Sequence, residues 1–305
     1  MLSKKFKIII GIVVALFIAL IITGFMPVKE SENSDGLVGA ITIAGSTAMQ
    51  PLITKSSNSF MDKYQDVSIT VQGGGSGTGL TQVYQGAITV GDSDVFAEDM
   101  LTDAQTSKLV NHNVVVEPFA VVVSDDVGVK NLTTKQLQEI FSGKITNWDE
   151  VGGPNLPIII VHRPASSGTR VTFANTIMGG NKNLEDDSIG ITADSNGNVE
   201  TTVKSTPGTI GYLALSYARS AEERGSLKVI DINGESAADA NIENGKYVFW
   251  SYGHMYTYGE PNKVTEAFID YVKSPENNDN ILSLGYIPIS LMKVTLVDGG
   301  KAIQY

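Results

Sequence analysis

The sequence contains no cysteine and only three histidines, and each shortage excludes a class of site. Without cysteine there is no disulfide, no thiolate zinc site, no cysteine nucleophile and no lipoprotein anchor of the bacterial type. His112, His162 and His254 show neither H-x-x-x-H nor H-E-x-x-H spacing, so a histidine metal site has no support. A G-x-S-x-G nucleophile segment is also missing from the sequence. We therefore expect no catalytic residue, no metal and no cofactor.

Basic residues are also few, with 22 Lys and Arg against 33 Asp and Glu and a net charge of −11. Nucleic acid binding requires a basic surface, so this balance argues against nucleic acid as a partner. An anion site in such a protein has to act through donors fixed close to the anion, because the overall field is unfavourable. The hydrophobic content of 42% and the charged content of 18% are those of an ordinary globular protein.

The N-terminus combines Lys4, Lys5 and Lys7 with an uncharged run over residues 8–28. About 20 apolar residues span a bilayer, and the basic flank predicts a cytoplasmic N-terminus with the rest of the chain outside the cell. The run is longer than the apolar part of most signal peptides, and no clear cleavage site follows it. We expect an uncleaved signal-anchor helix in residues 1–28 and a polar tether in residues 29–39. A cleaved and secreted form is the alternative.

Strand-like and helix-like runs alternate along the rest of the chain, which predicts an α/β fold with helices on the faces of a sheet. The expected strands are residues 40–43, 67–71, 87–90 and 114–123, and the expected helices are residues 49–63, 78–85, 102–110 and 134–142. In such folds ligands bind beyond the carboxyl ends of the strands.

Three segments rich in glycine and hydroxyl residues lie at such strand ends, each just before a predicted helix. They are residues 44–51, 73–79 and 162–170. The first N–H groups of a helix lack intrahelical partners and attract anions, and the guanidinium of Arg163 or Arg170 can hold two oxygens at once. Each segment alone also fits a helix cap or a tight turn. Because all three recur at the same place in the fold, we predict that they converge on one oxyanion.

Asp94 lies at a fourth strand end, in Gly91-Asp92-Ser93-Asp94. It can be a helix cap or an ion-pair partner of an arginine. A carboxylate beside an anion site also has a chemical use, because hydrogen phosphate carries a proton that Asp94 can accept and sulfate does not. Sites built to pair with a substrate hydroxyl reject analogues without it by factors of about 10⁴–10⁵. Asp94 is thus a candidate for selecting phosphate over sulfate.

Three further features have plainer interpretations. His162 is expected at the end of a strand, and the acidic residues 185–187 are expected in a solvated loop. The aromatic residues in the segment 247–258 are expected to pack in the core or at a hinge rather than to hold a cofactor.

With these motifs in view, the chain resembles the phosphate-binding proteins of ABC transporters, the PstS family of periplasmic-binding-protein folds. The resemblance runs from about residue 41 to residue 291. Each motif is short, but their order and spacing together are specific. The motifs are Gly45-Ser46-Thr47, residues 73–79, 91–94, 141–148 and 151–153, Ser167-Gly168-Thr169 and residues 208–212.

The resemblance implies a set of phosphate ligands in this sequence: Thr47, Ala48, Ser76, Asp94, Arg163, Ser167, Gly168 and Thr169. One position departs from the family pattern. Many members carry an acidic residue two positions after the arginine, which holds the guanidinium, and this chain has Ala165 there. We expect Asp94 or Asp92 to orient Arg163 instead, with Arg170 as a possible second clamp.

The resemblance further implies a two-lobed type II fold with two crossover strands, near residues 118–121 and 247–249. Lobe one is then residues 40–118 plus 249–305, and lobe two is residues 119–248. The implied function is a monomeric extracytoplasmic receptor that passes inorganic phosphate to the membrane subunits of an ABC permease. Alternatives are a receptor for sulfate, molybdate or tungstate, a phosphate-sensing receptor or scaffold, and a phosphatase-like hydrolase.

Overall fold

The computed structural model describes residues 36–297 and 301–304. The expected signal-anchor helix and most of the expected tether lie outside these residues. Among the described residues, no helix combines the length and the apolar character needed to cross a membrane.

A mixed ten-stranded sheet forms the centre of the described residues, with strand order β2-β1-β3-β10-β4-β8-β6-β7, while β9 pairs with β4 and β5. The strands pair in parallel among β1, β2 and β3 and among β6, β7 and β8, whereas β10 and β4 run antiparallel to their neighbours. The strands are β1 (Gly39–Gly45), β2 (Val67–Gln72), β3 (Val90–Ser93), β4 (Leu109–Val123), β5 (Asn131–Leu132), β6 (Ile159–His162), β7 (Ile191–Thr192), β8 (Thr209–Ala214), β9 (Lys228–Ile232) and β10 (Trp250–Tyr258), with a separate hairpin of β11 (Val294–Val297) and β12 (Lys301–Gln304).

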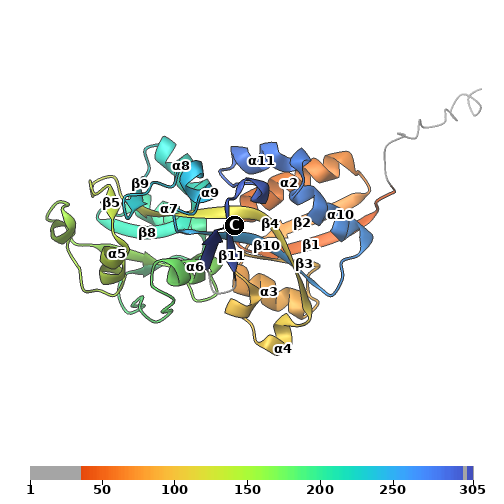
Figure 1. Cartoon of the computed structure of the whole chain (residues 1–305), viewed down its shortest axis with the longest axis horizontal. Coiled ribbons are helices and arrows are strands. Elements are labelled where there is room, and N and C mark those ends of the chain that lie inside the picture. The colour runs from red at the N-terminus through yellow and green to blue at the C-terminus, as the bar shows by residue number, and fades with distance from the viewer. Residues whose placement is uncertain (1–35, 298–300, 305) are drawn as a thin grey trace, which may run out of the picture. The chain divides into compact units, whose positions relative to one another are not determined.

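Helices cover both faces of this sheet (Figure 1), so the predicted α/β class is confirmed. The α-helices are α2 (Gln50–Lys63), α3 (Ser76–Tyr84), α4 (Asp103–Thr106), α5 (Thr134–Phe141), α6 (Gly168–Thr176), α7 (Asn196–Ser205), α8 (Leu215–Glu223), α9 (Asp239–Glu243), α10 (Lys263–Val272) and α11 (Asn278–Ser283). Short 3-10 helices lie at Ala97–Asp99, Trp148–Val151, Pro275–Asn277 and Ile289–Leu291.

The 15-residue strand β4 changes partner along its length. It pairs with β10 as far as Pro118 and with β8 from Phe119 onward. Proline has no N–H to donate to a ladder, so it fits where the hydrogen-bond pattern passes from one neighbour to the other. The buried apolar residues gather in two large clusters, one containing Ile41 and Phe268 and the other containing Phe119 and Tyr212.

Two predicted elements are wrong in their extent. The expected helix over residues 102–110 is only the four-residue α4, because β4 already begins at Leu109 and pairs there with β10. The β-branched and apolar residues after Lys108 gain more from sheet pairing than from one more helical turn. The expected strand over residues 87–90 starts only at Val90. The aromatic segment is confirmed as core, since Tyr247, Phe249 and Trp250 are fully buried.

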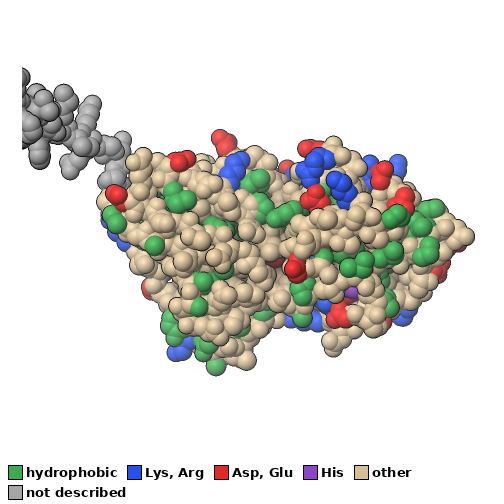
Figure 2. Space-filling view, turned by 180° about the vertical axis from the view of Figure 1, so that it is seen from behind, with side chains coloured by type: hydrophobic (Ala, Val, Ile, Leu, Met, Phe, Trp, Pro, Cys, Tyr) green, Lys and Arg blue, Asp and Glu red, His purple; other side chains and the backbone are tan. Residues whose placement is uncertain are grey.

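On the face drawn in Figure 2, Lys and Arg side chains lie scattered among Asp and Glu side chains. No continuous basic surface is visible there, in keeping with the acidic composition.

Candidate functional site

The three glycine-hydroxyl segments meet beyond the carboxyl ends of β1, β2 and β6. Gly75 N donates to the carbonyl of Gly45 at 2.8 Å, and Gly77 N donates to the carbonyl of Ser166 at 3.0 Å. These contacts join residues that the chain separates by about 30 and 90 positions. A methyl group on Gly168 would lie 2.2 Å from Ser76 Oγ, so only glycine allows α6 to approach α3 this closely.

Thr47 is buried in the turn between β1 and α2, and its hydroxyl oxygen lies close to more than one hydrogen-bond donor. Thr47 Oγ1 accepts from Asn196 Nδ2 at 2.9 Å and lies 3.4 Å from Arg163 Nη2. Because the oxygen accepts these bonds, the hydroxyl proton is left to be donated elsewhere. The N–H of Ala48 lies 3.0 Å from Ser46 Oγ and donates to it, so this N–H is already used within its own turn.

Ser76 begins α3 and is fully buried. Its Oγ accepts from the backbone N–H of Asp94 at 3.0 Å, which fixes the turn after β3 against the start of α3. The hydroxyl proton of Ser76 is again left free to donate.

Asp94 is the carboxyl group at the centre of these donors, and only 2% of it is exposed. Its Oδ2 accepts from the hydroxyl of Thr169 at 2.9 Å. Its Oδ1 has no hydrogen-bond partner among the described residues. Burial raises the pKa of Asp94, while the nearby hydroxyl groups of Ser46 and Thr169 and the charge of Arg163 oppose that rise.

Arg163 follows β6 and is buried, with 1% exposed. Its Nε donates to the carbonyl of Ala193 at 3.1 Å, and its Nη2 lies 3.4 Å from the carbonyl of Asp194. These backbone carbonyls, rather than Asp94 or Asp92 as expected, orient the guanidinium where Ala165 supplies no carboxylate. Its Nη1 has no partner among the described residues, so the N–H groups at this edge of the guanidinium remain available to an anion.

The N-terminus of α6 provides further donors. Ser167 is the N-cap, and its Oγ accepts from Arg170 N at 3.3 Å. The first N–H groups of a helix have no intrahelical acceptor, and the helix dipole favours negative charge beside Gly168 and Thr169. Both residues are buried.

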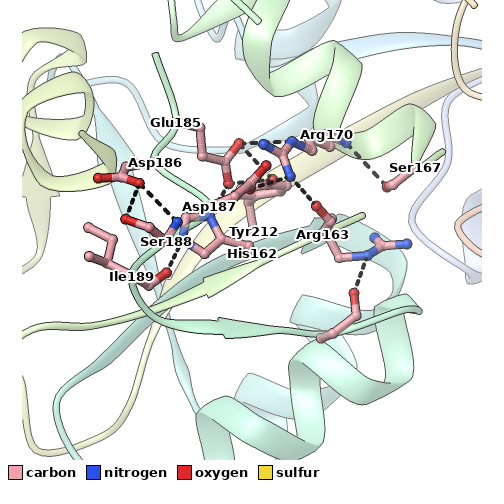
Figure 3. Close-up of polar contacts among 11 residues, drawn as sticks. His162, Arg163, Ser167, Arg170, Glu185, Asp186, Asp187, Ser188, Ile189 and Tyr212 are labelled. Carbon is pink, nitrogen blue, oxygen red and sulfur yellow. Dashed lines mark hydrogen bonds and ion pairs between the residues drawn. The ribbon is translucent and has the colours of Figure 1, made fainter. Parts of the chain in front are cut away.

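Arg170 does not join the site as a second clamp. Figure 3 shows that it turns away, toward Glu185 and Asp187, with Nε 3.4 Å from Glu185 and Nη1 2.7 Å from Asp187. Nη1 also donates to the carbonyl of Arg163 at 2.6 Å. Arg170 thus holds the backbone that carries Arg163.

Glu185 corrects the expectation of a solvated loop, because only 5% of it is exposed. Its carboxylate accepts from the hydroxyl of Tyr212 at 2.9 Å and lies 2.5 Å from His162 Nδ1 (Figure 3). His162 ends β6, as predicted, and its Nε2 lies 2.7 Å from the carbonyl of Ile189. Tyr212, His162 and Arg170 come from separate elements and together compensate the buried Glu185, which explains why this acid lies inside the fold.

The sequence interpretation missed two residues that contact the site. Asn196, at the start of α7, is fully buried and donates to Thr47, while its Oδ1 accepts from Ala214 N at 2.8 Å. Tyr217 donates from its hydroxyl to the carbonyl of Thr47 at 3.2 Å. No local signal marks either residue, because an asparagine at a helix start is commonly a cap.

The assembled groups are suited to hold a small anion. Hydroxyl protons of Thr47 and Ser76, the free Nη1 of Arg163 and the N-terminus of α6 are donors, and Asp94 Oδ1 is an acceptor among them. No group of three His, Cys, Asp or Glu able to hold a metal ion occurs within the described part of the chain. Gly77 and Ser166 also line a groove of about 700 Å³, together with Gln82 and Lys182 among others.

Comparisons with known proteins identify the family of the chain. Residues 30–276 match the PBP superfamily domain. The chain is 40% identical to the phosphate-binding protein PstS of Bacillus subtilis over 306 aligned residues, which cover 98% of this chain and 99% of that protein.

Two solved structures are also similar to this chain. A putative phosphate ABC transporter substrate-binding protein from Clostridium perfringens, solved with bound phosphate, is 26% identical with a TM-score of 0.75, covering 82% of this chain and 100% of that one. An ABC-type phosphate transport receptor from Vibrio cholerae is 26% identical with a TM-score of 0.65, covering 81% and 99%. The chain therefore belongs to the PBP superfamily and, within it, to the PstS family of phosphate-binding proteins.

Proposed function

We propose that this protein is an extracytoplasmic receptor that captures inorganic phosphate and delivers it to the membrane subunits of an ABC permease. The observation that carries the proposal is Asp94. It is a buried carboxyl group with one free oxygen, surrounded by hydroxyl, guanidinium and helix N-terminal donors. An anion that keeps a proton can satisfy both kinds of group at once, and phosphate is such an anion.

The proposed phosphate ligands are Thr47, Ser76, Asp94, Arg163, Ser167, Gly168 and Thr169. Ala48 belongs to the proposed set as well, with an N–H that it shares between the anion and Ser46 Oγ. Thr47 and Ser76 donate from their hydroxyls, Arg163 donates from Nη1, and the start of α6 supplies N–H groups. Asp94 accepts the proton of the anion.

The proposed architecture has two lobes that close on the ligand, residues 40–118 with 249–305 and residues 119–248. The partner change of β4 after Pro118 supports this division. Contacts between Thr169 and Asp94 and between Asn196 and Thr47 join the proposed lobes. An anion held by both lobes favours the closed form, which is the form that a permease can recognise.

The proposal includes a monomer that performs no reaction on its ligand, and an N-terminal membrane anchor as predicted from residues 1–28. Capture and release of the anion require no bond within the anion to break. Incubation with p-nitrophenyl phosphate tests the hydrolase alternative, and turnover that a single substitution in the site abolishes would contradict a pure binding role.

Calorimetric titration of the phosphate-free protein tests the proposal itself. We expect phosphate to bind tightly and sulfate weakly. Equal binding of phosphate and sulfate, or tighter binding of molybdate or tungstate, would instead assign the site to another oxyanion. Phosphate binding together with loss of phosphate uptake in a deletion strain supports the transport role, whereas uptake that does not depend on this protein supports sensing.

A further inference from the structure

Helix α6 carries a row of polar side chains that bind across the two proposed lobes. Thr169, Thr172 and Asn175 are spaced three residues apart, so they lie along one face of the helix. The hydroxyl of Thr169 donates to Asp94 Oδ2 at 2.9 Å, and the hydroxyl of Thr172 donates to the carbonyl of Asp94 at 3.4 Å. One turn further along, Asn175 Nδ2 donates to Asp99 Oδ1 at 3.3 Å. This face of α6 therefore follows lobe one from Asp94 to Asp99.

Asp99 ends the 3-10 helix that follows β3, and it also meets Lys182 from the loop after α6. Lys182 Nζ donates to the backbone carbonyl of Asp99 at 2.8 Å and lies 3.7 Å from its Oδ1. The side chain of Asp99 is only 12% exposed, and a carboxylate in such a place is stabilised by a cation and by hydrogen bonds. Asn175 and Lys182 supply one of each. Both belong to proposed lobe two, so these contacts break when the lobes separate.

Water can reach the ion pair between Asp99 and Lys182. Both residues line the groove of about 700 Å³ that Gly77 and Ser166 also line. Gly77 N donates to the carbonyl of Ser166 at 3.0 Å, so this groove runs along a second contact between the proposed lobes. After separation, water from the groove can solvate the carboxylate and the ammonium group. Polar contacts of this kind suit an interface between lobes that opens and closes.

Building on the proposed phosphate function and its two lobes, we propose that Asp99, Asn175 and Lys182 form a latch that holds the closed form without touching the anion. Contacts made only in the closed form raise the population of that form, and the apparent affinity rises with the population that can hold the anion. The latch therefore adds to the affinity for any anion that both lobes hold. Asp99 is a positioning residue in this account, whereas Asp94 chooses the anion.

A double-mutant cycle with Asp99→Ala and Lys182→Met tests the latch in the full-length protein by calorimetric titration of phosphate. We expect K182M to weaken phosphate binding roughly fivefold, as for a hydrogen-bonded ion pair that is partly exposed, and D99A to weaken it at least as much. The double variant should lose less than the product of the two single losses, because both substitutions remove the same ion pair. Lys228→Met is the matched control, since Lys228 is 47% exposed like Lys182 but pairs with Asp125 inside lobe two.

Two further readouts separate a latch from an ordinary structural contact. Without phosphate, K182M and the wild type should unfold at the same denaturant concentration. At a high phosphate concentration K182M should unfold at a lower concentration than the wild type, because the latch stabilises only the closed form. The ratio of phosphate to sulfate affinity should stay that of the wild type in K182M, whereas Asp94→Asn should change it.

Several results would overturn the latch: an unchanged phosphate affinity in K182M, single losses that simply multiply in the double variant, or an equal loss of stability with and without phosphate. A changed ratio of phosphate to sulfate affinity in K182M would also overturn it, since the latch would then act on the anion itself. A wild type that binds another oxyanion in place of phosphate defeats the proposed function, and the same cycle with that anion still decides the latch. A wild type that binds none of these anions overturns both.

Discussion

The hydroxyl of Thr169 donates to Asp94 Oδ2 at 2.9 Å, joining the start of α6 to the turn after β3 across 75 positions of the chain. Both side chains are buried, with 1% and 2% exposed. This bond stabilises the ionised form of Asp94 and leaves its other oxygen free. One contact thus fixes both the position and the charge of the acceptor on which the proposed selectivity depends.

Thr169→Val removes this donor and keeps the shape of the side chain. We expect phosphate affinity to fall about tenfold at neutral pH, because a hydrogen bond to a charged group is lost. Thr169→Ser keeps the hydroxyl and should bind within a few fold of the wild type. Calorimetry on the two variants separates the hydroxyl from the methyl group, and equal affinities would show that the hydroxyl has no part in binding.

Arg163→Lys keeps the positive charge but cannot reproduce the planar guanidinium that bonds Ala193 and still directs Nη1 into the site. We expect a loss of about 2–3 kcal/mol in phosphate binding, or roughly 30- to 150-fold. Arg224→Lys is the control, since Arg224 is exposed and pairs with Glu200 away from the site. Similar affinities for R163K and R224K would contradict the role of Arg163.

Glu185→Ala should destabilise the protein by about 3 kcal/mol, because it leaves Arg170 and His162 without their buried carboxylate. Phosphate affinity should fall as well, since Arg170 holds the carbonyl of Arg163. Asp187→Ala is the comparison, because Asp187 also pairs with Arg170 but its side chain is 64% exposed. This substitution should lower the free energy of unfolding by at most about 1 kcal/mol. Denaturant unfolding measures both, and equal losses would refute the buried network as a support.

His254 gives a pH-dependent prediction. Burial lowers the pKa of His254 from 6.5 to about 3. Below pH 6.5 the unfolded chain takes up a proton that the folded protein does not accept until about pH 3, so stability is lost as the pH falls through this window. The loss from this group between pH 7 and pH 5 is about 2 kcal/mol.

Denaturant unfolding of the wild type and His254→Gln at the two pH values tests this. The wild type should lose about 2 kcal/mol more than the variant on going from pH 7 to pH 5. Equal losses would mean that His254 is accessible to protons in the folded state.

Local sequence patterns predicted much of the fold and of the candidate site. The strand-to-helix turns at Thr47, Ser76 and Arg163 could be found because glycine, hydroxyl groups and arginine at such turns have a direct physical use. The structure brings these turns together, helix α5 lies close to the predicted residues 134–142, and His162 ends strand β6 as expected.

The missed features depend on contacts between distant residues. Asn196 reaches Thr47 across 149 positions, and the burial of Glu185 depends on Tyr212, His162 and Arg170 together. Local sequence around an acid predicts exposure, because buried acids are rare unless they are paired. The sequence shows that Ala165 replaces the acidic residue of the family pattern. It could not show that the carbonyls of Ala193 and Asp194 orient Arg163 instead, since every residue carries a carbonyl.

The central claim is that Asp94 selects an anion carrying a proton, and calorimetry with phosphate and sulfate on the wild type and Asp94→Asn tests it most directly. The account predicts tight phosphate binding and little sulfate binding by the wild type. In D94N, whose amide can also donate, phosphate affinity should fall and sulfate affinity should rise. Equal binding of both anions by the wild type, or unchanged discrimination in D94N, would contradict the account.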